Sequence, residues 1–238
     1  MLAAESGWEG DGGRPYLPRA FSVAAAEPGA EGVRLDFLVQ VVGPGTERLA
    51  GLAVGERLAI TGPLGRGFSQ PAELNPNAAG GILVGGGIGV APIAIWRRAL
   101  VGAGVPTRVL LGYRDQQRYG GTELFDCSEV RIATEDGHRG HHGRVTELLG
   151  VLLEGDSAET AAVYACGPPA MLEAVRVMCA ERGVPAELAM EAPMGCGFGA
   201  CFGCAVPLAE GGYMRLCLDG PVVEAAKIET ALIPGSGH

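Results

Sequence analysis

Four cysteines near the C-terminal end of the chain have the spacing of iron–sulfur ligands. Cys196, Cys201, Cys204 and Cys217 follow the pattern C-x4-C-x2-C-x12-C. The first three reproduce the ligand spacing of plant-type [2Fe–2S] clusters, in which a fourth thiolate comes from later in the chain. Glycines alternate with these cysteines, and glycine readily takes the positive φ angles that turn backbone N–H groups toward cluster sulfurs. The pattern predicts a [2Fe–2S] cluster and therefore a redox partner for it.

Two other interpretations of the four cysteines stay open. Structural zinc also takes four thiolates, but zinc sites usually show two C-x2-C pairs, and here only Cys201 and Cys204 form one. Two disulfides are the other alternative. The remaining thiols, Cys127, Cys166 and Cys179, are scattered, and the apolar helical pattern around Cys179 is typical of a small buried hydrophobe.

Composition and charge exclude several classes of protein. The 238 residues include 18 basic and 27 acidic side chains, and the net charge of −9 argues against a nucleic-acid-binding surface. The chain has seven cysteines and no basic, apolar leader after Met1, which predicts a reducing compartment. The most apolar stretch, residues 82–96, is interrupted by glycines and a proline and is too short to cross a bilayer. We expect a soluble, cytoplasmic protein that contacts neither nucleic acid nor membrane.

Short apolar runs alternate with helical patterns in the middle of the chain. Strands are predicted over 82–84, 108–112, 130–134 and 161–165, and helices over 91–100, 145–153 and 169–181. Strands that alternate with helices of this length are typical of a parallel sheet covered on both faces. We therefore expect a Rossmann-like α/β nucleotide-binding domain.

Two glycine-containing turns follow strands of this predicted sheet. The first, residues 85–92, opens a helix, whose free N–H groups and dipole favour a phosphate. The second, residues 164–169, also leads into a helix, and ligands of open α/β sheets bind at this edge. A purely structural role stays open for each turn. The candidate dinucleotide-binding residues are Gly85, Gly87, Gly89, Cys166, Gly167 and Pro168.

Charged side chains beyond these turns leave the choice of dinucleotide open. Arg114 is suited to the 2′-phosphate of NADP and Asp115 to the 2′-hydroxyl of NAD, and we favour NAD. His138, His141 and His142 are flanked by glycines and are expected in a solvated loop rather than in a catalytic cluster.

The first 77 residues have the pattern of β-structure with turns. Strands are predicted over 33–42 and 57–61, with a turn over 42–46, which suggests a small barrel or sandwich. An arginine with a nearby hydroxyl in residues 19–22, and the Gly45-Thr46 backbone, are suited to pyrophosphate. Taken singly, each segment is also compatible with an ordinary turn.

Taken in their order along the chain, these motifs resemble those of the ferredoxin-reductase-like flavoproteins. Within that group they are most similar to the electron-transfer subunits of NAD-linked dihydroorotate dehydrogenases. The likeness covers nearly the whole chain, and its most specific parts are the cysteine pattern and the order of flavin, nicotinamide and iron–sulfur segments. The residues that carry it are Arg19 to Ser22, Val41 to Thr46, Gly62 to Gly65, Gly67-Phe68, Gly85 to Pro92, Gly112 to Arg114, Ala133 to Gly137, Cys166 to Pro168, and the four cysteines with Asp219 to Val222.

The resemblance implies three modules. They are an antiparallel FAD-binding β-barrel over 1–77, the NAD-binding α/β domain over 78–190 and a [2Fe–2S] subdomain over 191–238. Members of the family usually have proline where Ala20 stands and often asparagine where Arg66 stands. They also begin with further strands before the segment that matches Met1, so the expectation is a barrel without its first strands and a start codon further upstream. The implied FAD contacts are Arg19, Ala20, Phe21, Ser22, Leu38, Val39, Gln40, Gly45 and Thr46.

The resemblance also implies an oxidoreductase subunit of pyrimidine biosynthesis. A catalytic partner subunit with FMN would oxidise dihydroorotate, and electrons would pass through the [2Fe–2S] cluster and FAD to NAD+, in a heterotetramer with two copies of each subunit. The cofactors carry the redox chemistry, so no side chain is assigned as a catalytic acid or base. The alternatives are the flavin/NAD(P) subunit of a sulfide dehydrogenase or of an NADH-dependent ferredoxin:NADP oxidoreductase, and a non-catalytic, zinc-stabilised nucleotide-binding protein.

Overall fold

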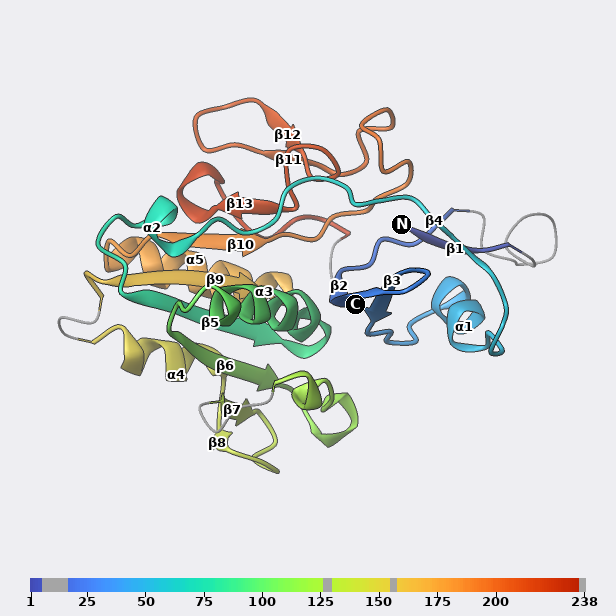
Figure 1. Ribbon diagram of the computed structural model, residues 1–238. Coiled ribbons are helices and arrows are strands. Elements are labelled where there is room, and N and C mark those ends of the chain that lie inside the picture. Colours follow the sequence, from blue (N-terminus) through green and yellow to red (C-terminus); the bar gives the residue numbers. More distant parts are fainter. Residues whose placement is uncertain (6–16, 126–129, 155–157, 236–238) are drawn as a thin grey trace.

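A seven-stranded sheet is the largest element of the computed structural model, which describes residues 1–5, 17–125, 130–154 and 158–235. Its strand order is β13-β10-β9-β5-β6-β7-β8 (Figure 1). Six strands are parallel, and β13 is antiparallel to β10. The strands are β5 (Gly80–Gly86), β6 (Thr107–Tyr113), β7 (Val130–Thr134), β8 (His141–His142), β9 (Ala161–Cys166), β10 (Ala186–Ala189) and β13 (Val222–Glu224). The predicted parallel sheet is confirmed.

Helices cover both faces of this sheet because its strands are apolar on both sides. Helix α3 (Val90–Gly102) packs on the face that includes Leu83 and Tyr164. Helices α4 (Val145–Leu152) and α5 (Pro169–Glu181) pack on the opposite face, with Val84 and Val163. None of the described helices has the length and apolarity needed to cross a membrane. The short 3-10 turns are η1 (Gly87–Gly89), η2 (Gln116–Arg118), η3 (Thr122–Leu124) and η5 (Ala225–Lys227).

The N-terminal module contains two small sheets, seen at the right of Figure 1. Strand β1 (Leu2–Ala4) pairs with β4 (Leu58–Ile60), and β2 (Val23–Gly29) forms a hairpin with β3 (Gly32–Phe37). Helix α1 (Pro44–Ala50) follows the hairpin, and α2 (Pro71–Leu74) precedes β5. Within the described residues these strands do not close into a barrel, so the barrel stays a prediction.

Two predictions for this module were wrong in detail. The strand predicted over 33–42 ends at Phe37, and the turn predicted over 42–46 begins helix α1. Proline is well placed at the first helical position, because its missing N–H has no partner there in any helix. The Thr46 hydroxyl accepts hydrogen bonds from the N–H groups of Val42 and Gly43, at 2.8 and 3.1 Å, which fixes the start of the helix.

The C-terminal segment shares its core with the nucleotide module. Strands β11 (Ala205–Pro207) and β12 (Tyr213–Arg215) form a hairpin, and β13 then joins the large sheet. Val206 and Leu216 are fully buried in the same apolar cluster as residues of α4 and α5. The predicted domain boundaries at 77/78 and 190/191 stay predictions. The boundary at 190/191 divides residues that pack in a single apolar core.

Candidate cofactor sites

The four predicted cluster ligands lie together at the junction between a loop and a hairpin. Cys204 and Cys217 are buried, Cys196 is half-buried and Cys201 is exposed. The Cys201 N–H lies 3.4 Å from the Cys196 sulfur, and the Gly203 N–H lies 3.5 Å from the Cys201 sulfur. The cysteines that the structure describes are free thiols, which argues against the disulfide interpretation.

The surroundings of the sulfurs separate them into two pairs. Hydrogen bonds from backbone N–H groups, first that of Cys201 and then that of Phe198, lower the pKa of Cys196 to about 6. The Cys201 thiol also hydrogen-bonds Cys196. Burial, and next the hydrogen bond with Cys204, raise the pKa of Cys217. The thiols are therefore paired as Cys196 with Cys201 and Cys204 with Cys217.

This donor set fits a [2Fe–2S] cluster. It consists of thiols, and backbone N–H groups point at their sulfurs, as an anionic iron–sulfur centre requires. Within the described residues, no group of three or more His, Cys, Asp or Glu side chains is gathered around one point where a single metal ion would bind. Cys196 also raises the pKa of Cys217, so the two pairs lie next to each other, as the four ligands of a [2Fe–2S] cluster must.

Positive backbone φ angles shape the cysteine loop, residues 191–204. Gly197 and Gly199 have φ of 78° and 83°, as expected for glycines beside cluster sulfurs. Phe202 also has a positive φ, 55°, which is costly for a residue with a side chain. The sequence pattern identified the glycines but gave no signal for Phe202, whose ring lies under the Arg215 guanidinium at 5.5 Å.

The cysteine loop packs directly on the N-terminal module. A Cβ atom at Gly197 would lie 2.7 Å from the Met1 sulfur and 3.1 Å from the Leu64 side chain. A Cβ at Gly195 would lie 3.6 Å from the Leu17 side chain. The loop that carries the predicted cluster ligands is therefore in contact with the predicted flavin module.

The two predicted glycine turns meet at one edge of the large sheet. Gly85 of β5 pairs in register with Cys166 of β9. A Cβ at Gly89 would collide with the Cys166 carbonyl oxygen and lie 2.6 Å from the Gly167 nitrogen. Gly87 has a φ of 52° and open space where a Cβ would stand. The structure thus brings Gly85, Gly87, Gly89, Cys166, Gly167 and Pro168 together, in an arrangement that fits a dinucleotide phosphate at a strand–helix edge.

The Cys166 thiol in this edge is buried, and burial raises its pKa. It is therefore a protonated, apolar group and not a nucleophile at neutral pH. Gly86, which lies within the predicted turn 85–92 but was not among the candidate binding residues, also belongs to the edge. A Cβ there would lie 2.9 Å from the Pro168 ring.

The charged residues near the end of β6 are partly paired with one another. The Asp115 carboxylate caps η2 and forms an ion pair with Arg118 at 2.5 Å, whereas Arg114 is exposed. His138 lies 2.7 Å from the Asp136 carboxylate, and this contact, first among several, lowers the pKa of Asp136 to about 2. His141 contacts Glu147 instead, so its partner differs from that of His138.

The predicted flavin residues fall into two groups. The Arg19 guanidinium lies against the start of helix α1, since a Cβ at Gly45 would stand 2.5 Å from its Nε atom. Arginine beside the first N–H groups of a helix is an arrangement that fits a pyrophosphate.

The other predicted flavin residues have different surroundings. Phe21 packs in the core of the N-terminal module, and Leu38 packs beside Val90 of the nucleotide module. Ala20, Ser22 and Gln40 are exposed and Val39 is half-buried, while Thr46 is buried with its hydroxyl on Gly43.

A family model and sequence relatives agree on one class of protein. The model of the iron–sulfur cluster binding domain of dihydroorotate dehydrogenase B matches residues 191–229. The chain is 38% identical over 219 residues to the dihydroorotate dehydrogenase B (NAD(+)) electron transfer subunit of Desulforamulus reducens, covering 90% of this chain and 80% of the relative. It is 40% identical over 189 residues to the subunit of the same name from Bacillus caldolyticus, covering 78% of this chain and 70% of the relative.

The solved structures give the same fold. The chain is similar to the structure described as an NADH-dependent reduced ferredoxin-NADP oxidoreductase that performs flavin-based electron bifurcation. The TM-score is 0.77 at 26% sequence identity, and the match covers 90% of this chain and 75% of that chain. A ferredoxin reductase in carbazole 1,9a-dioxygenase is also similar, with a TM-score of 0.61 and 25% identity over 77% of this chain and 55% of that chain. The fold is ferredoxin-reductase-like.

Proposed function

Because the chain belongs to the family of electron transfer subunits of dihydroorotate dehydrogenase B, we propose that it carries electrons from a dihydroorotate-oxidising partner subunit to NAD+. It is an oxidoreductase subunit with FAD, a [2Fe–2S] cluster and NAD as cofactors. FAD, when bound, links the two-electron hydride chemistry of NAD to the one-electron chemistry of the cluster. The task of the protein is to bind these groups close together and to control their surroundings.

Each group is assigned to residues that the structure brings together. Cys196 and Cys201 hold one iron of the cluster, and Cys204 and Cys217 hold the other. The paired thiols and the N–H groups that point at them support this assignment. The glycine turns at the ends of β5 and β9 bind the dinucleotide. Arg19 and the start of α1 bind the FAD pyrophosphate, supported by the contact between the Arg19 guanidinium and Gly45.

The observation that carries this proposal is the contact between the cysteine loop and the N-terminal module. Met1, Leu17 and Leu64 lie against Gly195 and Gly197 of the loop. These apolar contacts bring the two modules within van der Waals distance of each other. Electron exchange between a cluster and a flavin requires such closeness, and no side chain is needed as an acid or base.

The outer side of the cysteine loop is proposed to receive the catalytic FMN subunit. Phe198, Phe202 and Tyr213 of this subdomain are 67%, 63% and 75% exposed, and the exposed Leu218 side chain lies against Gly199 of the loop. Large exposed apolar side chains close to one another are typical of protein interfaces. We further propose a cytoplasmic heterotetramer with two copies of each subunit.

Anaerobic purification of the native complex tests the function. We expect a second subunit that oxidises dihydroorotate, together with absorption and a paramagnetic signal after reduction that are characteristic of flavin and [2Fe–2S]. The isolated chain should reduce dyes with NADH but should not oxidise dihydroorotate. Dihydroorotate oxidation by this chain alone would contradict the proposal. A co-purifying sulfide dehydrogenase or NADP-linked partner would assign the chain to a different complex.

A further inference from the structure

A carboxylate is buried in the large sheet outside the sites described so far. The side chain of Glu187 on strand β10 is 1% exposed. Its neighbours in the strand, Ala186 and Leu188, are buried and apolar. A buried carboxylate is strongly disfavoured unless it is paired and hydrogen-bonded, so the partners of Glu187 identify what it holds in place.

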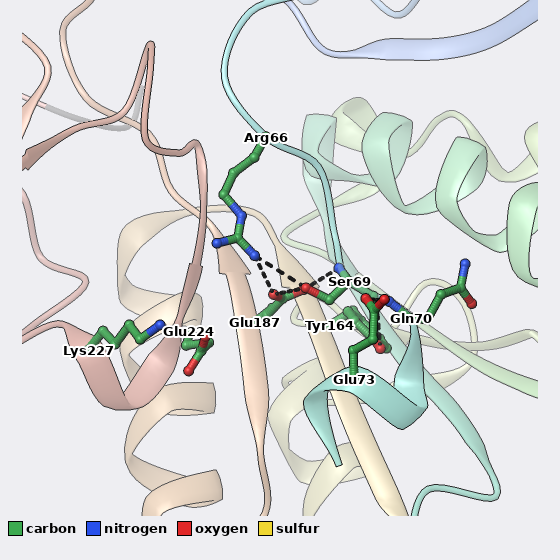
Figure 2. A network of polar contacts seen from close by, with 8 residues as sticks. All are labelled: Arg66, Ser69, Gln70, Glu73, Tyr164, Glu187, Glu224 and Lys227. Carbon is green, nitrogen blue, oxygen red and sulfur yellow. Dashed lines mark hydrogen bonds and ion pairs between the residues drawn. The ribbon is translucent and has the colours of Figure 1, made fainter. Parts of the chain in front are cut away.

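Those partners come from the segment that connects the N-terminal module to the nucleotide module, residues 61–70, here called the linker (Figure 2). The backbone N–H and the hydroxyl of Ser69 each donate to the Glu187 carboxylate at 2.7 Å. The Arg66 guanidinium lies 3.5 Å from the same carboxylate. The Tyr164 hydroxyl donates to the Ser69 carbonyl oxygen at 2.9 Å. Ser69 is thus held by its N–H, its C=O and its side chain.

The other end of the linker contacts the cluster subdomain. The Leu64 side chain lies against Gly197 of the cysteine loop. The Arg66 N–H donates to the carbonyl oxygen of Gly220, which precedes β13. The linker therefore extends from the cysteine loop to the nucleotide sheet, and Glu187 anchors it at the sheet.

Glu187 itself lies away from the dinucleotide edge. In the parallel pairing of β9 and β10, Glu187 faces Tyr164 and Ala189 faces Cys166. Glu187 is therefore two residues, about 7 Å, further back along the strand than the dinucleotide turn. The hydrogen bonds of its carboxylate go to Ser69 and Arg66 of the linker and not to residues of the dinucleotide turn.

The attachment of the N-terminal module to the nucleotide module does not depend on this anchor alone. Arg98 of α3 forms an ion pair with Glu27 of β2 at 3.1 Å, and β2 packs along α3. Leu38 packs beside Val90 at the start of α3. Loss of the Glu187 anchor should therefore disturb the linker and its contact with the cysteine loop more than it disturbs the approach of the N-terminal module to the dinucleotide edge.

We propose that Glu187 is a positioning residue for electron transfer between the cluster and the flavin. Its carboxylate fixes Ser69 and Arg66, so that the linker holds Leu64 against the cysteine loop. The inference rests on the proposed function, because it assigns FAD to the N-terminal module and the cluster to the four cysteines. In the proposed direction the flavin would receive electrons singly from the cluster and pass a pair to NAD+ as a hydride, and NADH added in a test would drive the same two exchanges in reverse. Glu187 controls the exchange between the cluster and the flavin.

The test compares Glu187→Gln and Ser69→Ala with a matched control, Glu224→Gln. Glu224 lies opposite Glu187 on β13, but its carboxylate pairs with Lys227 at the surface, at 2.7 Å, and not with the linker (Figure 2). In the apoprotein, hydrogen exchange of the linker amides should be faster in the two anchor variants and unchanged in Glu224→Gln. This measurement does not depend on cofactors.

In the reconstituted protein, rapid mixing with NADH separates the two electron-transfer steps. Flavin reduction should proceed at the wild-type rate in all three variants. Cluster reduction should slow on the order of tenfold in Glu187→Gln, since a small misplacement of reacting groups has large effects on rate, and less in Ser69→Ala. The Glu224→Gln control should keep both rates.

Three results would overturn the inference. They are unchanged linker exchange, a wild-type rate of cluster reduction in the folded anchor variants, or an equal loss of both steps. If Glu187→Gln fails to fold, the exchange and rate measurements on Ser69→Ala test the inference. This variant keeps the buried carboxylate and its hydrogen bond from the residue-69 N–H, and it loses only the hydrogen bond from the hydroxyl. If NADH fails to reduce any cluster in the wild-type protein, the proposed function fails, whereas the exchange data still decide whether Glu187 anchors the linker.

Discussion

The dinucleotide edge and the cysteine loop hold their candidate ligand groups in opposite ways. At the dinucleotide edge the glycine turns follow strands β5 and β9, which pair in register, and each turn leads into a helix. Residues 191–204 of the cysteine loop contain neither strand nor helix. They are fixed by N–H···S bonds, by positive φ angles and by side chains of the N-terminal module.

Glycine accordingly has a different role in each region. Gly89 has an ordinary φ of −63°, and it is required because the Cys166 and Gly167 backbone leaves no space for a Cβ. Gly197 and Gly199 have positive φ angles that other residues adopt only with strain. Close packing of backbone against backbone requires glycine at Gly89, whereas backbone conformation requires it at Gly197 and Gly199.

The largest expected effect comes from removing one cluster ligand. Cys201→Ser should abolish the [2Fe–2S] chromophore and electron exchange with the partner subunit, because an iron loses a thiolate. NADH–dye activity should persist in part, since the dinucleotide edge belongs to a different region. Absorption, iron and sulfide analysis, and dye assays measure the two effects separately. Cys179→Ala is the control: this thiol is buried in α5 and is not among the four predicted ligands, so its loss should leave the chromophore intact. Complete loss of dye activity in Cys201→Ser would show that the regions are not independent.

A second substitution tests the need for space at the dinucleotide edge. Gly89→Ala should raise the KM for NADH on the order of tenfold or more, because the backbone atoms of Cys166 and Gly167 must move to admit the methyl group. The control is Gly102→Ala at the end of the same helix, where no described atom outside the neighbouring helix backbone lies within 4 Å of the added Cβ. That change should stabilise the fold by up to about 1 kcal/mol. An unchanged KM in Gly89→Ala would show that the dinucleotide does not bind at this edge.

The same contrast explains which features of the fold could be predicted. Strand β7 and helix α5 match their predicted ranges, because hydrophobic periodicity and the short strand–helix turns mark their ends. Helix α1 was missed because Gly43, Pro44 and Gly45 are equally typical of turns, and the capping by Thr46 depends on local geometry.

The candidate sites were predictable where ligand spacing is local and unpredictable where contacts are distant. The cysteine pattern is readable because three ligands fall within nine residues, 196 to 204, and the assignment of the ligands stays a prediction. Glu187 gave no signal, since its partner Ser69 lies 118 residues earlier in the chain. The strain at Phe202 was equally hidden, because nothing in the residue type requires a positive φ there.

A smaller effect is expected at Gly197, where glycine serves backbone conformation and the close neighbours are side chains that can shift. Gly197→Ala should make the cluster more labile, because a left-handed conformation costs a residue with a side chain about 1–2 kcal/mol and because Met1 and Leu64 must shift. The control is Gly203→Ala in the same loop, where φ is not positive and the nearest atom, the Pro193 carbonyl oxygen, is 3.3 Å away. The lifetime of the visible chromophore in the presence of a chelator measures the difference. Equal lifetimes in both variants would mean that backbone conformation does not protect the cluster.

The smallest expected effect concerns how the segment after the cysteine loop is attached to the nucleotide module. Glu173 of α5 accepts hydrogen bonds from the Ala231 N–H at 2.7 Å and from the Thr230 hydroxyl at 3.1 Å. The ion pair with Arg176, ahead of these bonds, lowers the pKa of Glu173 to about 2. At neutral pH, Glu173→Gln should therefore lower the free energy of unfolding by about 1–2 kcal/mol.

The sign of the pH dependence follows from the direction of that shift. The folded-state pKa of Glu173 lies below the unfolded-state value of 4.5, so the stabilisation is complete above pH 4.5 and is lost as the pH falls toward 2. Denaturant unfolding of wild-type protein and Glu173→Gln at a series of pH values should give curves that converge on acidification, whereas Glu181→Gln on the same helix should follow the wild type throughout. A difference that stays constant below pH 4.5 would mean that Glu173 stabilises through packing and not through its charge. In that case the C-terminal segment would be held by close packing, like the dinucleotide edge. It would not be held by polar contacts, like the cysteine loop.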